Sequence, residues 1–436
     1  MTDLEKIARA IFFETLRSVD VPAMIRQRVR LDGNLLMFDE KVYDLSRFVD
    51  VILIGIGKAS LQMGYAMEAI LGERLTQGLL VTNRREPLHL KSEIIVASHP
   101  VPDEQSLRAG KRAIEILNHC HPDSLVIFLI SGGGSSLFEA PISDEITLEV
   151  LQQLNRILVE CGATIEEINI VRKQFSAVKG GRLREWMRAG KAVALLVSDV
   201  NTGDFKTLAS NPLFPEEKTV EQVQAIIDRY KLADKLPQLF QHFPDLRYPA
   251  PAKPGEGSET IIETMLLAEN ADVVRVAAKI ARNLGYMVWV DRPDNEEPYE
   301  KTAARLVASV AELKRANPVE KVCVVSGGEV SCPANSQGFG GRNQEFVLYC
   351  AMKLKQASLS DSLVLSCGTD GLDGRSVSDG ALANIRQSDS HLLDETELGH
   401  YFQASDTACW FNEYGGMLVI GPTGNNLRDI RIILSD

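Results

Sequence analysis

A repeated alternation of short apolar runs with longer amphipathic segments constrains this chain more than any other feature. The run Val51–Ile54 is rich in β-branched residues, is closed by a glycine and leads into a helix-like segment that ends at Gly72. Such a run is typical of a strand buried on both faces, and the segment after it has the helical period. Strand–helix alternation predicts an α/β fold with a mainly parallel sheet. Further strands are expected at residues 78–82, 94–97, 125–130 and 192–197, with helices at 4–18, 22–30, 106–119, 148–161 and 180–188.

A stretch rich in proline and glycine, residues 243–258, divides the chain and is expected to be a loop. A second strand–helix series follows it. The 436 residues therefore predict two α/β domains, a Rossmann-like layered domain over residues 1–255 and a smaller one over residues 256–436. The elements expected in the second domain are helices at 259–284, 297–315 and 343–355 and strands at 286–290, 322–325 and 362–367.

Composition excludes several classes of partner. With 47 basic and 59 acidic residues the net charge is −12, which repels nucleic acid, so an anionic ligand must be held by local cations and backbone N–H groups. The apolar runs are too short to span a membrane, and the acidic, amphipathic N-terminus favours the cytoplasm. Seven cysteines without a C-x-x-C pair predict neither a disulfide framework nor a zinc ribbon, and the seven histidines show no zinc spacing or catalytic triad.

Two glycine-rich loops follow predicted strands, where α/β proteins bind ligands. Residues 55–60 carry Gly57 and Lys58 but have Ser60 where the dinucleotide fingerprint needs a third glycine, and they lack the P-loop spacing. The remaining interpretation is an anion held by backbone and Lys58, and the alternative is a tight turn with a solvated lysine. Residues 131–136 contain three consecutive glycines, whose N–H groups can cradle an anion, although a flexible loop is the alternative.

Charged residues mark four more loops. Four cations lie within eleven residues beside Gly180 and Gly181, and they indicate either an anion site or a solvated helix face. Paired aspartates follow two predicted strands, where they suit Mg²⁺ carried on substrate phosphates or serve as turn formers. An arginine at a helix start matches phosphate or carboxylate oxygens bidentately. The residues are Arg172, Lys173, Lys179 and Arg182; Asp199 and Asp204; Asp370 and Asp373; and Arg342.

Taken in order, these loops resemble those of the class II glycerate 2-kinases, which carry a C-terminal MOFRL domain. The resemblance covers about residues 5–430. It implies two α/β domains with the active site between them, and transfer of the ATP γ-phosphoryl group to the 2-hydroxyl of D-glycerate with Mg²⁺. The loops that carry it are 57–59, 99–104, 131–135, 169–173, 179–181, 198–204, 326–329, 340–345 and 368–374.

The loops and the resemblance together give each candidate residue an expected role. The catalytic residues are Lys58, Arg342 and Asp199. Nucleotide and phosphates are expected at Gly57, Ser131, Gly132, Gly133, Gly134, Ser135 and Lys179. The substrate, D-glycerate or a related sugar acid, is expected at Arg172, Asn343 and Glu345, and the metal at Asp204 and Asp370.

Two departures from the family pattern affect these expectations. Asn211 stands where the family usually has glycine, and Asn425 stands where it has threonine. The rival function is an NAD(P)-dependent hydroxypyruvate reductase. It is disfavoured by Ser60 and because strand 78–82 is closed by Asn83 and Arg84 and not by a convincing acidic residue. A non-catalytic sugar-acid sensor is a third alternative, and a homodimer is left open.

Overall fold

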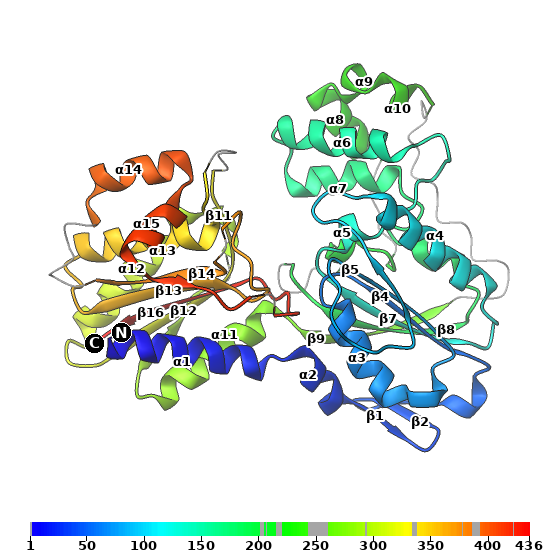
Figure 1. The fold of residues 1–436 in the computed structure, drawn as a ribbon, viewed down its shortest axis with the longest axis horizontal. Coiled ribbons are helices and arrows are strands. Elements are labelled where there is room, and N and C mark those ends of the chain that lie inside the picture. Colours follow the sequence, from blue (N-terminus) through cyan, green and yellow to red (C-terminus); the bar gives the residue numbers. More distant parts are fainter. Residues whose placement is uncertain are drawn as a thin grey trace. The chain divides into compact units, whose positions relative to one another are not determined.

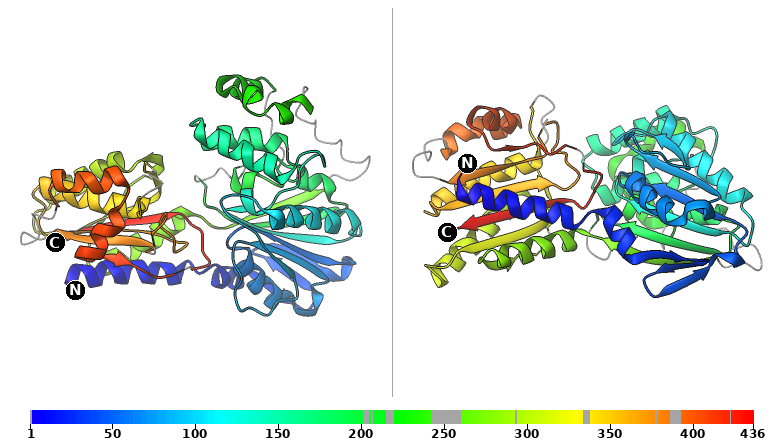
Figure 2. Two further views of the ribbon diagram at one scale, coloured as in Figure 1. Left: turned by 45° about the horizontal axis from the view of Figure 1, so that its top comes forward. Right: turned by 60° about the horizontal axis from the view of Figure 1, so that its bottom comes forward.

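The computed structural model divides the chain into two compact units, and each is described here by itself (Figures 1 and 2). The first unit contains residues 21–267, and the second contains residues 1–20 and 268–436. The described residues are 2–200, 205, 207–214, 220–242, 260–292, 294–333, 338–376, 378–385, 393–421 and 423–436.

A six-stranded sheet with the order β6-β5-β4-β7-β8-β9 forms the centre of the first unit. Strands β6, β5, β4, β7 and β8 pair in parallel, and β4, β7 and β8 are almost wholly buried, as their continuous apolar runs predict. The strands are β4 (Val51–Ile56), β5 (Gln77–Thr82), β6 (Glu93–Val96), β7 (Leu125–Ser131), β8 (Lys191–Val197) and β9 (Ile261–Ala268).

Helices cover both faces of this sheet (Figure 1). Leu80 of β5 lies against Gly64 of α3 (Ser60–Leu71), whereas its neighbours Leu79 and Val81 belong to the apolar cluster that contains Ala113 of α4 (Glu104–His119). Because successive strand residues point to opposite faces, α3 and α4 lie on opposite sides of the sheet.

The strand order reverses at β4. The chain runs from β4 to β5 and β6 on one side, then returns to place β7 and β8 on the other side. Such a reversal leaves a crevice outside the carboxyl ends of the two central strands, here β4 and β7, and ligands of open α/β sheets bind there. The two glycine-rich loops singled out in the sequence begin at these ends.

Two additions complete the first unit. A three-stranded antiparallel sheet precedes β4, and a helical cluster with its own core, which includes Leu154, Val171 and Ile227, follows β7. The helix α7 of this cluster lies near the crevice, where its Arg172 contacts Ser135. The elements are α2 (Val21–Arg28), β1 (Val29–Asp32), β2 (Leu35–Phe38), β3 (Lys41–Asp44), α5 (Gly134–Leu137), α6 (Leu148–Glu160), α7 (Ile165–Gln174), α8 (Val220–Tyr230), α9 (Leu232–Lys235) and α10 (Pro237–His242).

The second unit has a seven-stranded mixed sheet in the order β10-β12-β16-β13-β14-β15, with β11 also paired to β12. The C-terminal strand β16 lies antiparallel between β12 and β13, and α1 runs along the sheet beside it (Figure 2). Helices α12 and α13 pack on the other face (Figure 1). The strands are β10 (Met287–Val290), β11 (Asp294–Pro298), β12 (Val322–Ser331), β13 (Ser362–Gly368), β14 (Gly380–Ile385), β15 (Met417–Leu418) and β16 (Asp429–Ser435); the helices are α1 (Asp3–Ser18), α11 (Asn270–Asn283), α12 (Tyr299–Ala316), α13 (Arg342–Gln356), α14 (Glu395–Ala404) and α15 (Thr407–Tyr414).

The expected α/β class with a mainly parallel sheet and a smaller second α/β domain is confirmed. The expected boundary near residue 255 lies outside the described residues, and the compact units divide the chain differently. Residues 1–20 belong with the second unit because α1 buries Ile11 and Phe12 and packs against α11. Residues 260–267 belong with the first unit because β9 extends its sheet beside β8.

Two predicted helices are wrong. Residues 259–284 form strand β9 and then helix α11, which begins where Glu269 and Asp272 cap each other's backbone N–H groups. The capping pair is a helix-start signal within the apolar run, and hydrophobic periodicity alone does not reveal it. Residues 180–188 contain only a short 3₁₀ helix, Arg182–Trp186. Among the described residues, the structure contains no helix that is both long enough and apolar enough to cross a membrane.

Candidate functional site

A close backbone approach joins the loops that follow β4 and β7. Gly57 has φ +120°, and a Cβ placed on it would lie 2.3 Å from the carbonyl oxygen of Ser131. Next to it, the Lys58 N–H donates to the Gly132 carbonyl at 2.9 Å, and the Ala59 N–H donates to Ser131 Oγ at 3.0 Å. Only glycine fits at position 57, since both the φ and the distance exclude a side chain. The two predicted loops therefore form one structural unit.

Lys58 and His99 lie over the next loop residue, Gly133. A Cβ on Gly133 (φ +80°) would be 3.0 Å from Lys58 Cγ and 3.2 Å from His99 Cδ2. Desolvation of the ring and the positive charges of Lys58 and Arg172 lower the pKa of His99 to about 4. The His99 side chain is still exposed, so water screens part of this effect. The imidazole is uncharged at neutral pH, and the positive charge here comes from Lys58 and Arg172.

His99 is a residue that the search for histidine motifs missed. It has no metal-ligand spacing and no triad partner in the sequence. Its signals are its place shortly after the strand β6 and at the start of the loop 99–104, which belongs to the family resemblance. Position at the carboxyl end of a parallel strand was thus more informative than residue spacing.

Ser135, at the far end of the glycine-rich loop, is held from two sides by residues of α7 and of a strained turn. The Arg172 guanidinium donates to the Ser135 carbonyl oxygen at 2.8 Å. Ser135 Oγ lies 2.6 Å from Ser210 Oγ, and the Ser210 hydroxyl donates to Asn169 Oδ1 at 3.2 Å. Asn169 and Arg172 are three residues apart on α7, so both side chains lie on one helix face.

The turn that carries Ser210 has an unusual backbone. Ala209, Ser210 and Asn211 have φ of +51°, +58° and +54°, so three consecutive residues other than glycine are left-handed. Such a conformation costs about 1–2 kcal/mol per residue. Asn211 takes the place of the family glycine without losing the turn, because its amide bonds to the backbone of Phe214, whose N–H donates to Asn211 Oδ1 at 2.8 Å.

Lys179 does not have the exposure expected of a phosphate ligand. Its side chain is 1 % exposed, forms an ion pair with Glu139 and donates to the Phe138 carbonyl oxygen at 3.1 Å. Burial lowers the pKa of Lys179 to about 8 despite the Glu139 carboxylate. In this structure the lysine braces the segment behind the glycine-rich loop, and a contact of Lys179 with phosphate stays a prediction.

The aspartates after β8 are only partly described. Asp199 is the second residue after the strand and is half-buried, and Asp204 lies outside the described residues. Within the described ranges there is no group of three or more His, Cys, Asp or Glu side chains arranged to hold a metal.

In the second unit, Arg342 starts α13 and is held by two carboxylates. Its Nε and Nη2 donate to the two oxygens of Asp429 at 2.6 and 2.8 Å, and Nη2 also donates to Glu329 at 3.0 Å. Burial opposes ionisation of Asp429, but the positive charges of Arg342 and Arg431 lower its pKa. The bidentate contact fixes the plane of the guanidinium, and the Arg342 side chain remains 27 % exposed.

Asn343 and Glu345, two of the expected substrate ligands, are buried instead. Asp373 caps α13 by accepting from the N–H groups of Asn343 and Gln344, each at 3.0 Å, while Asn343 also bonds to Ser366. Asn343 is 0 % and Glu345 2 % exposed, so neither side chain faces solvent in this structure, and their contact with substrate stays a prediction.

The expected metal ligand Asp370 lies in the loop after β13. Its Oδ1 accepts from the Leu372 N–H at 3.1 Å, which is the contact of a turn former. This contact does not test whether Asp370 binds a metal, so that role stays a prediction.

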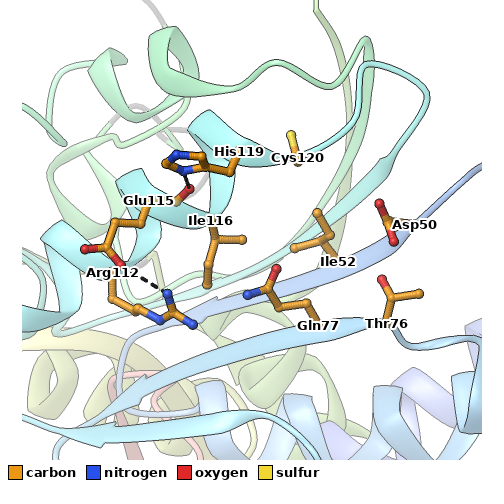
Figure 3. Close-up of a pocket in the computed structure, with 9 residues that line it drawn as sticks. All are labelled: Asp50, Ile52, Thr76, Gln77, Arg112, Glu115, Ile116, His119 and Cys120. Carbon is orange, nitrogen blue, oxygen red and sulfur yellow. Dashed lines mark hydrogen bonds and ion pairs between the residues drawn. The ribbon is translucent and has the colours of Figure 1, made fainter.

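A cavity of about 560 Å³ in the first unit lies at the opposite edge of the sheet from the glycine-rich loops (Figure 3). It opens at the amino ends of β4 and β5 and beside the last turns of α4, where Arg112 donates to Glu115 at 3.0 Å. It contains none of the expected site residues. Its lining is Asp50, Ile52, Thr76, Gln77, Arg112, Glu115, Ile116, His119 and Cys120.

The first unit is thus a doubly wound α/β domain in which two glycine-rich loops meet at the switch point of the sheet. Residues 7–243 match the family model described as a domain of unknown function, DUF4147, and residues 322–429 match the MOFRL family model. The chain belongs to the glycerate 2-kinase family with a C-terminal MOFRL domain, as the ordered loops implied.

Individual relatives agree on the family and differ in name. A D-glycerate 2-kinase of Thermotoga maritima is 31 % identical over 88 % of this chain and 90 % of its own length. A protein of Agrobacterium vitis named "Putative hydroxypyruvate reductase" is 35 % identical over 88 % of this chain and 86 % of its own length. The crystal structure of a glycerate kinase from Thermotoga maritima matches with a TM-score of 0.78, 29 % identity and 99 % coverage of both chains.

The buried carboxyl of Glu345 predicts a pH-dependent stability. Burial and the negative charges of Asp373 and Glu300 raise the pKa of Glu345 to about 7 from an ordinary 4.5. The native state then binds more protons than the unfolded state, so the free energy of unfolding falls as pH rises from about 4.5 to 7. Glu345→Gln should reduce this fall by up to about 3 kcal/mol, measured by urea unfolding across this pH range.

The exposed Glu397 provides the matched control, because Glu397→Gln should leave the pH dependence of stability as it is. An equal pH dependence in Glu345→Gln and the unmodified protein would show that the carboxyl titrates normally.

Proposed function

We propose that this chain is a D-glycerate 2-kinase, which transfers the γ-phosphoryl group of ATP to the 2-hydroxyl of D-glycerate and gives 2-phospho-D-glycerate. The observation that carries the proposal is the placement of Lys58 over Gly133 at the switch point of the first sheet. The relatives named as glycerate kinases support the same reaction.

Phosphoryl transfer depends on positioning and on neutralising the charge of the phosphates. In a chain of net charge −12, the cluster around Gly133 is a local positive region. Backbone N–H groups of the Gly132–Gly134 segment and the Lys58 ammonium would hold phosphate oxygens. His99 adds a neutral donor or acceptor, since its lowered pKa keeps it uncharged.

Arg172 is the proposed ligand of the substrate carboxylate, and Arg342 is the proposed stabiliser of the transferring phosphoryl group. A planar guanidinium matches the two oxygens of either group. Asp429 and Glu329 hold Arg342 in a fixed orientation before any ligand arrives, which lowers the entropic cost of using it.

We assign to Asp199 the role of orienting the acceptor hydroxyl or taking its proton, because it follows a strand whose neighbour ends in the glycine-rich loop. Mg²⁺ is part of the proposal as a companion of the ATP phosphates, where it would neutralise their charge. One or two carboxylates suffice for an ion held mainly by phosphates and water, and Asp199 and Asp370 have the oxygen donors for it.

The rival function is reduction of hydroxypyruvate with a nicotinamide cofactor, and the name of the Agrobacterium relative favours it. A dinucleotide site would require an acidic residue for the ribose after the second strand. There β5 is followed by Asn83 and Arg84, and Arg84 forms an ion pair with Glu86 at 2.8 Å. An arginine at the ribose position disfavours NAD but would suit the 2′-phosphate of NADP. The third glycine of the dinucleotide fingerprint, which both cofactors need, is replaced by Ser60, so the kinase is the better supported function.

The deciding experiment incubates the pure protein with D-glycerate and Mg·ATP, or with hydroxypyruvate and NADH or NADPH. We expect ADP and 2-phosphoglycerate in the first mixture and no oxidation of the reduced cofactor in the second. Oxidation of NADH or NADPH without ADP release would overturn the proposal, and inactivity in both mixtures would favour a non-catalytic sensor.

Lys58→Ala should lower kcat/KM for D-glycerate by on the order of 10²-fold or more, because an electrostatic stabiliser in a preorganised site contributes that much. The matched control is Lys91→Ala, which removes an exposed lysine paired with Glu73 on the surface of the same unit. Steady-state kinetics of both variants give the comparison. Equal kinetics for the two would return Lys58 to the role of a solvated turn residue.

A further inference from the structure

The hydroxyl groups around Ser135 form a short chain with a fixed direction. Asn169 Oδ1 can only accept a hydrogen bond, so the Ser210 hydroxyl donates its single proton in the 3.2 Å bond to Asn169. Either serine could donate in the 2.6 Å contact between them, and we assign the donor role to Ser135 because the Ser210 proton is directed to Asn169. The half-buried Ser135 hydroxyl is left with lone pairs and no proton for a ligand.

This direction decides what Ser135 is able to bind. A phosphate oxygen is an acceptor and finds no proton on Ser135, whereas an alcohol group donates and finds an acceptor there. The chain also ends at an amide, which takes up no proton at neutral pH, so Ser135 has no route for passing on the proton of a reacting hydroxyl. The fitting partner is therefore an alcohol that keeps its proton.

Arg172 places a carboxylate partner next to this acceptor. Its guanidinium holds the Ser135 carbonyl at 2.8 Å and comes from the same helix face as Asn169. An acid group at the guanidinium and an alcohol at Ser135 together describe a hydroxy acid with a hydroxyl besides the reacting one.

We propose that Ser135 is a specificity-determining residue that accepts a hydrogen bond from the non-reacting 3-hydroxyl of D-glycerate, with Ser210 and Asn169 as positioning residues that orient it. The inference rests on the proposed function and replaces the expected phosphate role of Ser135. The inference also explains the left-handed turn at Ala209–Asn211, because the turn brings the fully buried Ser210 within hydrogen-bond distance of Ser135 and Asn169.

The test compares D-glycerate with D-lactate, which has the same configuration and lacks the 3-hydroxyl. Dissociation constants of both acids, and of ADP, are measured by calorimetry on the full chain, so no turnover is needed. The unmodified protein should prefer D-glycerate by on the order of 10-fold. Ser135→Ala should abolish this preference while leaving the affinities for D-lactate and ADP unchanged.

Two variants separate orientation from simple packing. Asn169→Asp ends the chain of hydroxyl groups in a carboxylate, which only accepts hydrogen bonds. The variant should therefore keep the ratio of the two dissociation constants, even if the added negative charge weakens the binding of both acids. Ser210→Ala frees the Ser135 proton and should reduce the ratio. Asn211→Gly is the control, because glycine adopts the left-handed turn freely and leaves Ser210 in place, so the ratio should persist.

The opposite results are equally distinct. The inference is wrong if the unmodified protein binds D-glycerate and D-lactate equally. It is also wrong if Ser135→Ala weakens the binding of ADP or weakens the binding of both acids alike. A third contradicting result is an Asn169→Asp protein that loses the ratio of the two dissociation constants while Asn211→Gly keeps it. A protein that shows the expected ratios but releases no ADP with D-glycerate would refute the kinase proposal and leave the hydroxyl assignment standing.

Discussion

The close approach of Gly57 to Ser131 is the contact on which the first unit's site depends. It places two loops from neighbouring parallel strands edge to edge, with the Lys58 N–H on the Gly132 carbonyl. Because the strands β4 and β7 pair directly, their carboxyl ends are fixed by the sheet, and the glycine allows the loops to meet. The side chains of Lys58 and His99 then both lie against Gly133.

Around this contact the structure arranges polar groups in two layers. The inner layer, nearest the glycine-rich loop, contains Lys58, His99 and Ser135. Behind it, buried Lys179 neutralises Glu139 and bonds to the backbone next to the loop. A buried pair of this kind is costly unless both members are satisfied, so we infer that Lys179 supports the loop.

Much of this could be predicted from the sequence, and the exceptions have physical causes. The buried parallel strands have continuous apolar runs, so the sequence predicts β4, β5, β7 and β8 and the candidate ligand loops after β4, β7 and β8. The strand β9 was taken for the start of a helix, since an apolar run joined directly to a helix has no glycine or proline to divide it. The β16 strand is central in its sheet, and its partners β12 and β13 are far away in the sequence.

Individual site residues were harder to predict than loops. Asn343 and Glu345 stand beside Arg342 in the sequence, but consecutive residues of a helix point in different directions, and these two face the core. The role of Ser135 depends on a hydroxyl chain through Ser210 and Asn169, 75 and 34 residues away, which no local motif contains.

The most direct test of this account is the kcat/KM of Gly57→Ala for D-glycerate, compared with that of Gly162→Ala. Both glycines have positive φ, but a Cβ on Gly162 meets nothing within 4 Å, so the pair separates the joining of the loops from backbone strain alone. We expect Gly57→Ala, with native circular dichroism, to lose on the order of 10²-fold in kcat/KM, and Gly162→Ala to lose stability only. A Gly57→Ala enzyme with unchanged kcat/KM would contradict the claim that this contact builds the site.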